Sequence, residues 1–258
     1  MGLNVPVETV LQKSGLTQGA LDQFESDAIV EGQPSWGDVC ELLELNPDKF
    51  RDVLGGWTPD PVSLESIPQL RQISTDDGGM QVNAFLIWDS DTGKAALFDT
   101  GWTAAPINTL LKEHSLKLKH LFITHQHHDH VAAMTPLRSD HPDMQLWAQG
   151  QGVPKQCQVG NGQSFSLGQI GIEARWTPGH AADGVTYIVS GLAGPHPKAA
   201  IVGDAIFAGS MGGAPQHFAL AKEKVREVIL SQPGSTLICP GHGPMTTVEQ
   251  ENRHNPLF

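Results

Sequence analysis

One short run of residues restricts the structure of this chain more than any other segment, and it reads Thr124-His125-Gln126-His127-His128-Asp129-His130. It directly follows an apolar, strand-like segment at 118–123. Imidazole and carboxylate groups together suit zinc, iron or manganese, and residues two apart on an extended chain point to the same side. His125 and His127 can therefore bind one ion. If the chain turns after His127, Asp129 and His130 are directed toward a second ion, as two-metal hydrolytic sites require.

Three later residues are further ligand candidates: His180, Asp204 and His242. Each stands at the end of a strand-like run and beside a glycine, where the backbone can turn and expose a side chain. A lone histidine is more often a hydrogen-bonded residue than a ligand, and a lone Gly-Asp pair is usually a turn. Their joint occurrence after the histidine run favours a shared metal site. His128 is expected on the opposite side of its segment, facing solvent.

The order of these residues resembles the metallo-β-lactamase superfamily of metallohydrolases, in which a His-x-His-x-Asp-His run precedes a distant His, Asp and His. The resemblance extends from about residue 73 to 258 and includes Asp99-Thr100-Gly101. It implies two sets of ligands that share one aspartate. The first set is His125, His127 and His180, the second is Asp129, His130 and His242, and the bridge is Asp204. It also implies that Asp99 lies behind the ligands and fixes an imidazole tautomer.

Two segments are similar to one group in this superfamily, the glyoxalase II-type (hydroxyacylglutathione hydrolase-like) thioesterases. They are the loop at 203–212 and the ending at 240–247, which is followed by Glu249 or Glu251 and by Asn255-Pro256. The helical extension that supplies much of the glutathione site in the longer glyoxalase II enzymes does not follow Phe258, so glutathione specificity is not implied. The bridging Asp204 argues against class B3 β-lactamases, which lack that carboxylate.

The resemblance implies a metallohydrolase that cleaves a small, acylglutathione-like thioester with a hydroxide shared by two divalent ions. Asp129 is the expected catalytic residue, because it orients this hydroxide. A thiolate leaving group needs little protonation, which suits a site with no evident general acid. Zinc is the expected ion, and iron or manganese fill similar sites. The alternatives are a mononuclear-iron persulfide dioxygenase, a lactonase or phosphodiesterase, and a non-catalytic interaction protein.

Composition and charge restrict the partners. The chain has 258 residues and a net charge of −12, and residues 1–60 contain 11 acidic against 3 basic side chains. Because such a segment repels a phosphate backbone, we expect a small-molecule substrate and no nucleic acid. No apolar run reaches the roughly 20 residues of a membrane span, and no secretory signal is evident, so we expect a cytoplasmic protein with no membrane partner. The three cysteines, Cys40, Cys157 and Cys239, have the spacing of free thiols.

The expected fold class is α/β (α+β), with two domains. Residues 1–58 are predicted to form an acidic, all-helical domain that caps the site or makes a homodimer contact; one of its helix faces includes Leu21 and Ala28. Residues 62–258 are predicted to form the catalytic domain, for which the resemblance implies an αββα sandwich. Strands are expected at 69–74, 81–88, 94–99, 118–124, 145–148, 170–177, 184–190, 198–204 and 236–240. Helices are expected at 106–114, 131–139 and 219–230.

Overall fold

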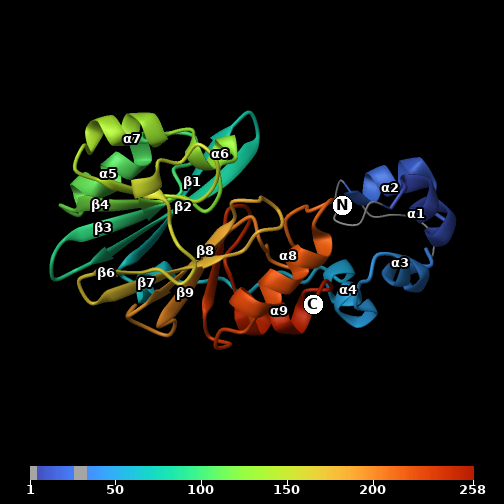
Figure 1. Cartoon of the computed structure of the whole chain (residues 1–258). Coiled ribbons are helices and arrows are strands. Elements are labelled where there is room, and N and C mark those ends of the chain that lie inside the picture. The colour runs from blue at the N-terminus through green and yellow to red at the C-terminus, as the bar shows by residue number, and fades with distance from the viewer. Residues whose placement is uncertain (1–4, 26–33) are drawn as a thin grey trace.

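The computed structural model describes residues 5–25 and 34–258. Two β-sheets stack face to face, and helices cover the outer side of each (Figure 1). The predicted αββα arrangement is thereby confirmed. Ala28, which the sequence placed on a helix face with Leu21, lies outside the described residues.

The first sheet has the strand order β1-β2-β3-β4-β5. The strands are β1 Leu70–Asp77, β2 Met80–Asp89, β3 Lys94–Phe98, β4 Lys117–Phe122 and β5 Gln145–Trp147. The pairs β1–β2 and β2–β3 are antiparallel, whereas β3–β4 and β4–β5 are parallel. The helices on its outer side are α5 Ala105–Glu113, α6 His128–Val131 and α7 Met134–Asp140.

The second sheet has the order β11-β10-β9-β8-β7-β6. The strands are β6 Ser164–Leu167, β7 Ile170–Trp176, β8 Val185–Ser190, β9 Lys198–Gly203, β10 Leu237–Pro240 and β11 Thr246–Thr247. Its pairs are antiparallel except for β9–β10. The outer side carries α8 Phe218–Lys224, its π-helical continuation Val225–Leu230, and α9 Val248–His254. Two short 3-10 helices, Leu64–Ser66 and Lys155–Cys157, lie in connecting segments.

Alternating side chains of the central strands supply three apolar clusters. In β2, Phe85 and Ile87 pack between the sheets, whereas Leu86 and Trp88 pack beneath α5 and α7. The second sheet divides in the same way, since Ile201 faces the first sheet and the next residue, Val202, faces the π-helical segment and α9. Successive residues of a strand point to opposite faces, so strands buried on both sides are apolar throughout.

The N-terminal residues form four short helices: α1 Val7–Ser14, α2 Gln18–Glu25, α3 Trp36–Leu42 and α4 Pro47–Leu54. The Asn46 side chain caps α4 by accepting hydrogen bonds from the backbone N–H groups of Asp48 and Lys49, and α4 ends at Gly55. Asn-Pro at the start of a helix and Gly-Gly after its end are typical boundary signals, so the local sequence accounts for both ends of α4. Figure 1 shows α4 beside α9, and the other three helices farther from the sheets. The cap and dimer roles stay predictions.

Several elements differ from the expectation. In place of the single helix expected at 131–139 there are two, α6 His128–Val131, which includes part of the histidine run, and α7 Met134–Asp140. Strand β6 was not predicted, although its four residues, Ser-Phe-Ser-Leu, alternate between polar and apolar. All three cysteines are free, as predicted. Among the described residues, no helix has the length and apolar character needed to cross a membrane.

Candidate metal centre

Four strands end beside the centre and deliver its side chains. The chain leaving β4 carries His125 and His127, and the loop between β7 and β8 carries His180. Asp204 follows β9 directly, and His242 follows β10. Because β4 belongs to the first sheet and the other three strands to the second, the centre lies where the two sheets meet at one end of the sandwich.

The predicted turn after His127 is present. His127 has an extended backbone (φ −64°, ψ 148°) and immediately precedes α6. The change from extended chain to helix directs Asp129 and His130 away from the side on which His125 and His127 lie. One short segment therefore contributes to two separate groups of ligand atoms.

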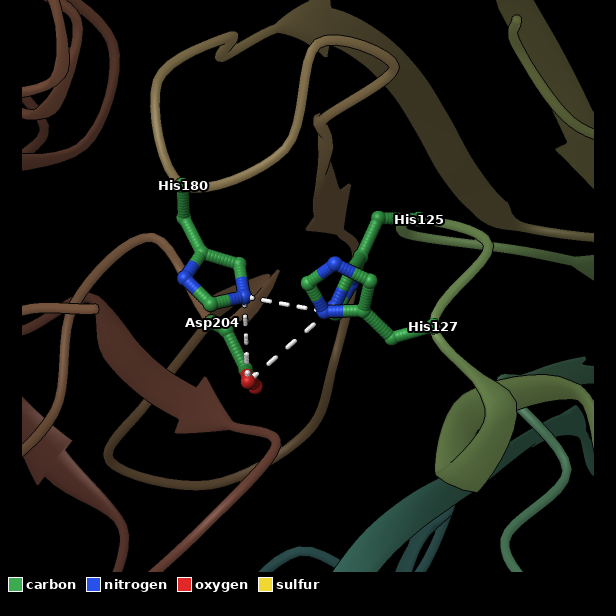
Figure 2. Close-up of side chains that lie close together, drawn as sticks. All are labelled: His125, His127, His180 and Asp204. Atoms are coloured by element: carbon green, nitrogen blue, oxygen red, sulfur yellow. Dashed lines mark hydrogen bonds and ion pairs between the residues drawn. The ribbon is translucent and has the colours of Figure 1, made fainter. Parts of the chain in front are cut away.

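The first group consists of His125, His127, His180 and Asp204 (Figure 2). His127 Nδ1 lies 3.0 Å from His125 Nε2 and 3.1 Å from His180 Nε2. Asp204 Oδ2 lies 3.5 Å from His180 Nε2. Figure 2 shows the three rings converging above the Asp204 carboxylate.

The second group consists of Asp129, His130 and His242. Asp129 Oδ2 lies 3.2 Å from His242 Nε2 and 3.5 Å from His130 Nε2. The Asp204 carboxylate reaches this group as well, with Oδ1 3.3 Å from His130 Nε2 and Oδ2 3.4 Å from His242 Nε2. The structure thus brings all seven predicted residues together, and it places Asp204 between the two groups.

Hydrogen bonds behind the centre orient three of the imidazoles. His130 Nδ1 donates to Asp99 at 2.7 Å, His180 Nδ1 donates to the carbonyl oxygen of Gly213 at 3.0 Å, and His242 Nδ1 donates to the carbonyl oxygen of Gln81. A proton on Nδ1 leaves Nε2 free to bind a cation, and this is how supporting residues tune metal sites. Asp99 has the position that the sequence predicted.

Burial and the nearby carboxylates shift the imidazole pKa values in opposite directions. Burial lowers the pKa of His125 to about 2, and the nearby His130 adds to this effect. Burial also disfavours the charged form of His130, but Asp99 and Asp204 outweigh it and raise the pKa to about 10. The pKa of His242 is raised by its hydrogen bond to Asp204, whereas burial lowers that of His180. For Asp204, the imidazoles of His130 and His242 outweigh burial and lower the pKa.

Three observations test whether these residues fit a cation. His130 Nε2 and Asp204 Oδ1 are buried without a hydrogen-bond partner, although polar atoms in protein interiors are normally paired. Zinc binds imidazole nitrogen at about 2.0–2.1 Å, so two ligand atoms on a tetrahedral ion lie about 3.3 Å apart, close to the distances above. A Cβ at Gly241 would collide with Asp204 and His130, so only glycine leaves this space open. The residues fit two divalent ions.

One supporting residue was not predicted. Asn83 of β2 is buried and donates through Nδ2 to the carbonyl oxygens of Pro240 (3.1 Å) and Gly243 (2.9 Å), on either side of His242. Its backbone N–H donates to the Gly241 carbonyl oxygen at 2.7 Å. A single amide side chain within the apolar run of β2 was the available signal. Asn83 therefore fixes the His242 loop of the second sheet to the first sheet.

A surface hollow lies beside His127. A hollow of about 360 Å³ is lined by Gln126, His127, Gly150, Gln151, Ala182 and Asp183. The Asp183 carboxylate accepts hydrogen bonds from the backbone N–H and the side-chain amide of Gln126, both at 3.0 Å. His128 is exposed, as expected, and its ring lies 5.5 Å from that of Trp102.

Comparison with known proteins agrees with this geometry. The chain is 29% identical to the probable metallo-hydrolase YqgX of Bacillus subtilis, over 70% of this chain and 94% of that protein. It is 31% identical to the persulfide dioxygenase ETHE1 of Mus musculus, over 67% of this chain and 69% of that protein. It is 29% identical to the hydroxyacylglutathione hydrolase GloC of Haemophilus influenzae, over 69% of this chain and 93% of that protein. Two different activities are therefore represented among relatives at about 30% identity.

Solved structures show the same architecture. The crystal structure of BLEG-1, named as a B3 metallo-beta-lactamase, is 25% identical, with a TM-score of 0.62 over 72% of this chain and 98% of that one. Residues 77–242, well over half of the 258, match the profile of the Metallo-beta-lactamase superfamily. The chain therefore belongs to the metallo-β-lactamase superfamily, as its sequence led us to expect.

Proposed function

We propose that this protein is a dinuclear metallohydrolase that cleaves a small thioester. The observation that carries the proposal is the division of seven donor side chains into two groups that share Asp204. The similarity to GloC, named a hydroxyacylglutathione hydrolase, supports the thioester bond. We propose zinc for both positions, with iron or manganese as the alternatives, and His125, His127, Asp129, His130, His180, Asp204 and His242 as the ligands.

Each carboxylate of the centre would have its own role in the reaction. Two bound divalent ions would supply a water of pKa about 7 and would polarise a substrate carbonyl group. Asp204 would neutralise charge on both sides of the centre, since its carboxylate lies beside His180 of the first group and beside His130 and His242 of the second. Asp129 Oδ2, in the second group, would accept a hydrogen bond from the attacking water and direct it toward the carbonyl carbon.

The burial of two side chains that could donate a proton favours a leaving group that needs none. Tyr187 is the single tyrosine of the chain, and it is fully buried and donates its hydroxyl to the Ile123 carbonyl oxygen at 2.9 Å. It is therefore not available to protonate a leaving group. Cys239 is also fully buried, and burial raises the pKa of its thiol. A thiolate, which departs without prior protonation, suits these surroundings better than an amide nitrogen.

The second candidate function is oxidation of a persulfide by a single iron, and the 31% identity to the persulfide dioxygenase ETHE1 favours it. Metal analysis separates the two functions. Two ions per chain with turnover of S-lactoylglutathione or a simpler acyl thioester support hydrolysis. One iron per chain with oxygen uptake on glutathione persulfide supports oxidation.

The test needs a control for contaminating enzymes and a wider set of substrates. The Asp129→Ala variant should lose hydrolysis by a factor of 100 or more, on the order expected when a group that orients the nucleophile is removed. A lactone, a phosphodiester and a β-lactam complete the panel. Thioester turnover that survives Asp129→Ala, or its absence in the metal-replete protein, would overturn the proposal.

A further inference from the structure

The segment 205–213 joins two parts of the metal centre. It starts directly after Asp204, and it ends at Gly213, whose carbonyl oxygen accepts the Nδ1 proton of His180. Gly212 has no room for a Cβ, which would collide with the Asp204 carbonyl oxygen and approach His180 Nδ1. A displacement of this segment would therefore disturb both the shared carboxylate and the orientation of one imidazole.

Helix α9 holds this segment from one side. Glu251 is fully buried, and its carboxylate accepts hydrogen bonds from the backbone N–H of Gly209 (3.0 Å), from Thr246 Oγ1 (2.8 Å) and from Asn255 Nδ2 (2.8 Å). Asn255 Nδ2 also donates to the carbonyl oxygen of Ser210 at 2.9 Å. Glu251 of α9 and Asn255, the residue that follows this helix, thus bind the backbone of successive residues at the middle of the segment.

The buried carboxylate has a stability cost. Burial raises the pKa of Glu251 and outweighs its three hydrogen bonds. A buried charge is retained only where its contacts compensate for lost hydration, and here the contacts hold a loop rather than the core. Glu249, two residues earlier on α9, is exposed and pairs with Arg253 at 3.0 Å instead.

The N-terminal helices hold the segment from the other side. Gly209 has φ +72°, and a Cβ there would lie 3.2 Å from the ring of Trp57. Trp57 stacks on His254 of α9 with ring centroids 4.9 Å apart, and His254 Nδ1 bonds Asp52 at 2.9 Å. Lys49 Nζ donates to the Asn252 carbonyl oxygen at 2.8 Å. Helix α4 and Trp57 are therefore fastened to the helix that carries Glu251.

We propose that α9 and α4 clamp the segment 205–213, and that Glu251 and Trp57 are positioning residues for the metal centre. Both helices lie outside residues 77–242, the part that matches the superfamily profile. The clamp gives the N-terminal helices a role at the centre without a contact to substrate. The inference rests on metal binding and is independent of the bond that the enzyme cleaves.

The test is the release of metal from the full-length, metal-loaded protein to a colorimetric chelator, with no substrate present. In Glu251→Gln, an amide nitrogen replaces one of the two acceptor oxygens, so at least one donor loses its partner. We expect metal release to become roughly tenfold faster, the lower end of the effect of altering residues behind metal ligands. The visible spectrum of the cobalt-substituted protein should change too, because the ligand geometry changes.

The matched control is Glu249→Gln, which makes the same chemical change at an exposed position of α9. It should release metal at the wild-type rate and keep the wild-type cobalt spectrum. Denaturant unfolding of each variant ensures that rates are compared under conditions in which every variant is folded. A folded Glu251→Gln protein with wild-type release and spectrum overturns the proposal.

Trp57→Ala tests the contact of the N-terminal helices with the segment 205–213. It also tests the proposal if Glu251→Gln does not fold. We expect release about threefold faster, because this change removes packing on Gly209 but leaves the hydrogen bonds of Glu251 in place. Trp36→Ala is its control, since Trp36 packs edge-on against Phe50 at 5.6 Å within the same helices. Equal acceleration by both substitutions would mean general loosening and would refute the role of Trp57. A wild-type protein that binds no metal would refute the proposed metal centre instead.

Discussion

Individual residues determine how the imidazoles face the centre. Asp99 is 2% exposed, has a left-handed backbone (φ 57°), and accepts from His130 Nδ1, from Thr124 Oγ1 and from the Thr124 backbone N–H. It therefore fixes His130 and the chain leading to His125 together. A non-glycine residue held at positive φ is strained, and such strain is typical of functional sites.

Asp99→Asn should weaken the binding of the second metal ion by roughly 10–100-fold, because an amide cannot accept all three hydrogen bonds. Equilibrium dialysis with metal analysis measures this. Asp89→Asn is the control: Asp89 is also buried and accepts from Thr92 and the Gln169 backbone N–H, far along the chain from the ligands. It should lower stability and leave metal affinity unchanged. Equal losses of affinity in the two variants would contradict the role of Asp99.

The opposite pKa shifts predict different pH dependence for the two groups. With a pKa lowered to about 2, His125 is already neutral at pH 6–8, so its ion displaces no proton from it. His130, with a pKa raised to about 10, is protonated in the metal-free protein at neutral pH and must lose that proton. The affinity of the second group for its metal ion should therefore rise by up to about tenfold per pH unit between pH 6 and 8. Calorimetric titration at several pH values should show a steeper pH dependence of affinity at the second group than at the first; two identical slopes would contradict this.

The sequence revealed the ligand candidates because histidine and aspartate at strand ends are uncommon and chemically specific. It did not reveal the groups that orient them. His180 and His242 are oriented by the carbonyl oxygens of Gly213 and Gln81, and a backbone carbonyl leaves no signature in the residue type. Such partners depend on the tertiary path of the chain.

At the scale of elements, apolar strands were predictable and short polar elements were not. The centres of β2 and β9 follow from apolar runs buried on both faces, whereas β6 has only four residues, with serine at two of them. Helix α9 reads VEQENRH and has no apolar periodicity, because the side chains that it buries include a glutamate. Burial of a hydrogen-bonded polar residue cannot be inferred from hydrophobicity alone.

Asn83 links one element of each sheet, so its removal should affect both stability and metal content. Asn83→Ala leaves the Pro240 and Gly243 carbonyl oxygens without their partner, at a cost of about 1–3 kcal/mol for each buried group that stays unpaired. We expect a lower denaturant midpoint and preferential loss of the ion bound by His242. Gln72→Ala is the control, since Gln72 Nε2 donates to the side-chain oxygen Oδ1 of Asn83 and, in the described part of the chain, makes no hydrogen bond to the His242 loop. Retention of two ions per chain by a folded Asn83→Ala protein would contradict this assignment.

At the scale of the whole molecule, the metal centre is the place where the two sheets are joined by ligand atoms. Asp129 and His130 come from the chain that follows the first sheet, and Asp204 and His242 follow strands of the second. Ions that bind both parts favour the assembled sandwich over any state in which the sheets separate. The αββα class was predictable from the motif order, whereas the packing of the N-terminal helices on α9 was not, since no local pattern specifies it.

Removal of the metal should therefore destabilise the entire fold. An ion that binds only the folded state adds about 2.7 kcal/mol when its concentration is 100 times its dissociation constant. Dialysis against a chelator should lower the denaturant midpoint, and returning zinc should restore it. As a control, wild-type protein is dialysed against chelator that is already saturated with metal, which reveals any direct effect of the chelator on the denaturant midpoint. An unchanged midpoint after verified metal loss would contradict the coupling.

The pairing of α4 with α9 also has a consequence during protein synthesis. Lys49 and the Asn252 carbonyl oxygen that it contacts are separated by 203 positions, so α4 leaves the ribosome long before its partner exists. A helix of eight residues is marginal in isolation, and the ring of Trp57 lacks the surface on which it stacks until α9 has been synthesised. Helix α4 can therefore take its final position only after the strands of both sheets have been made, and we expect its docking to be a late step of folding.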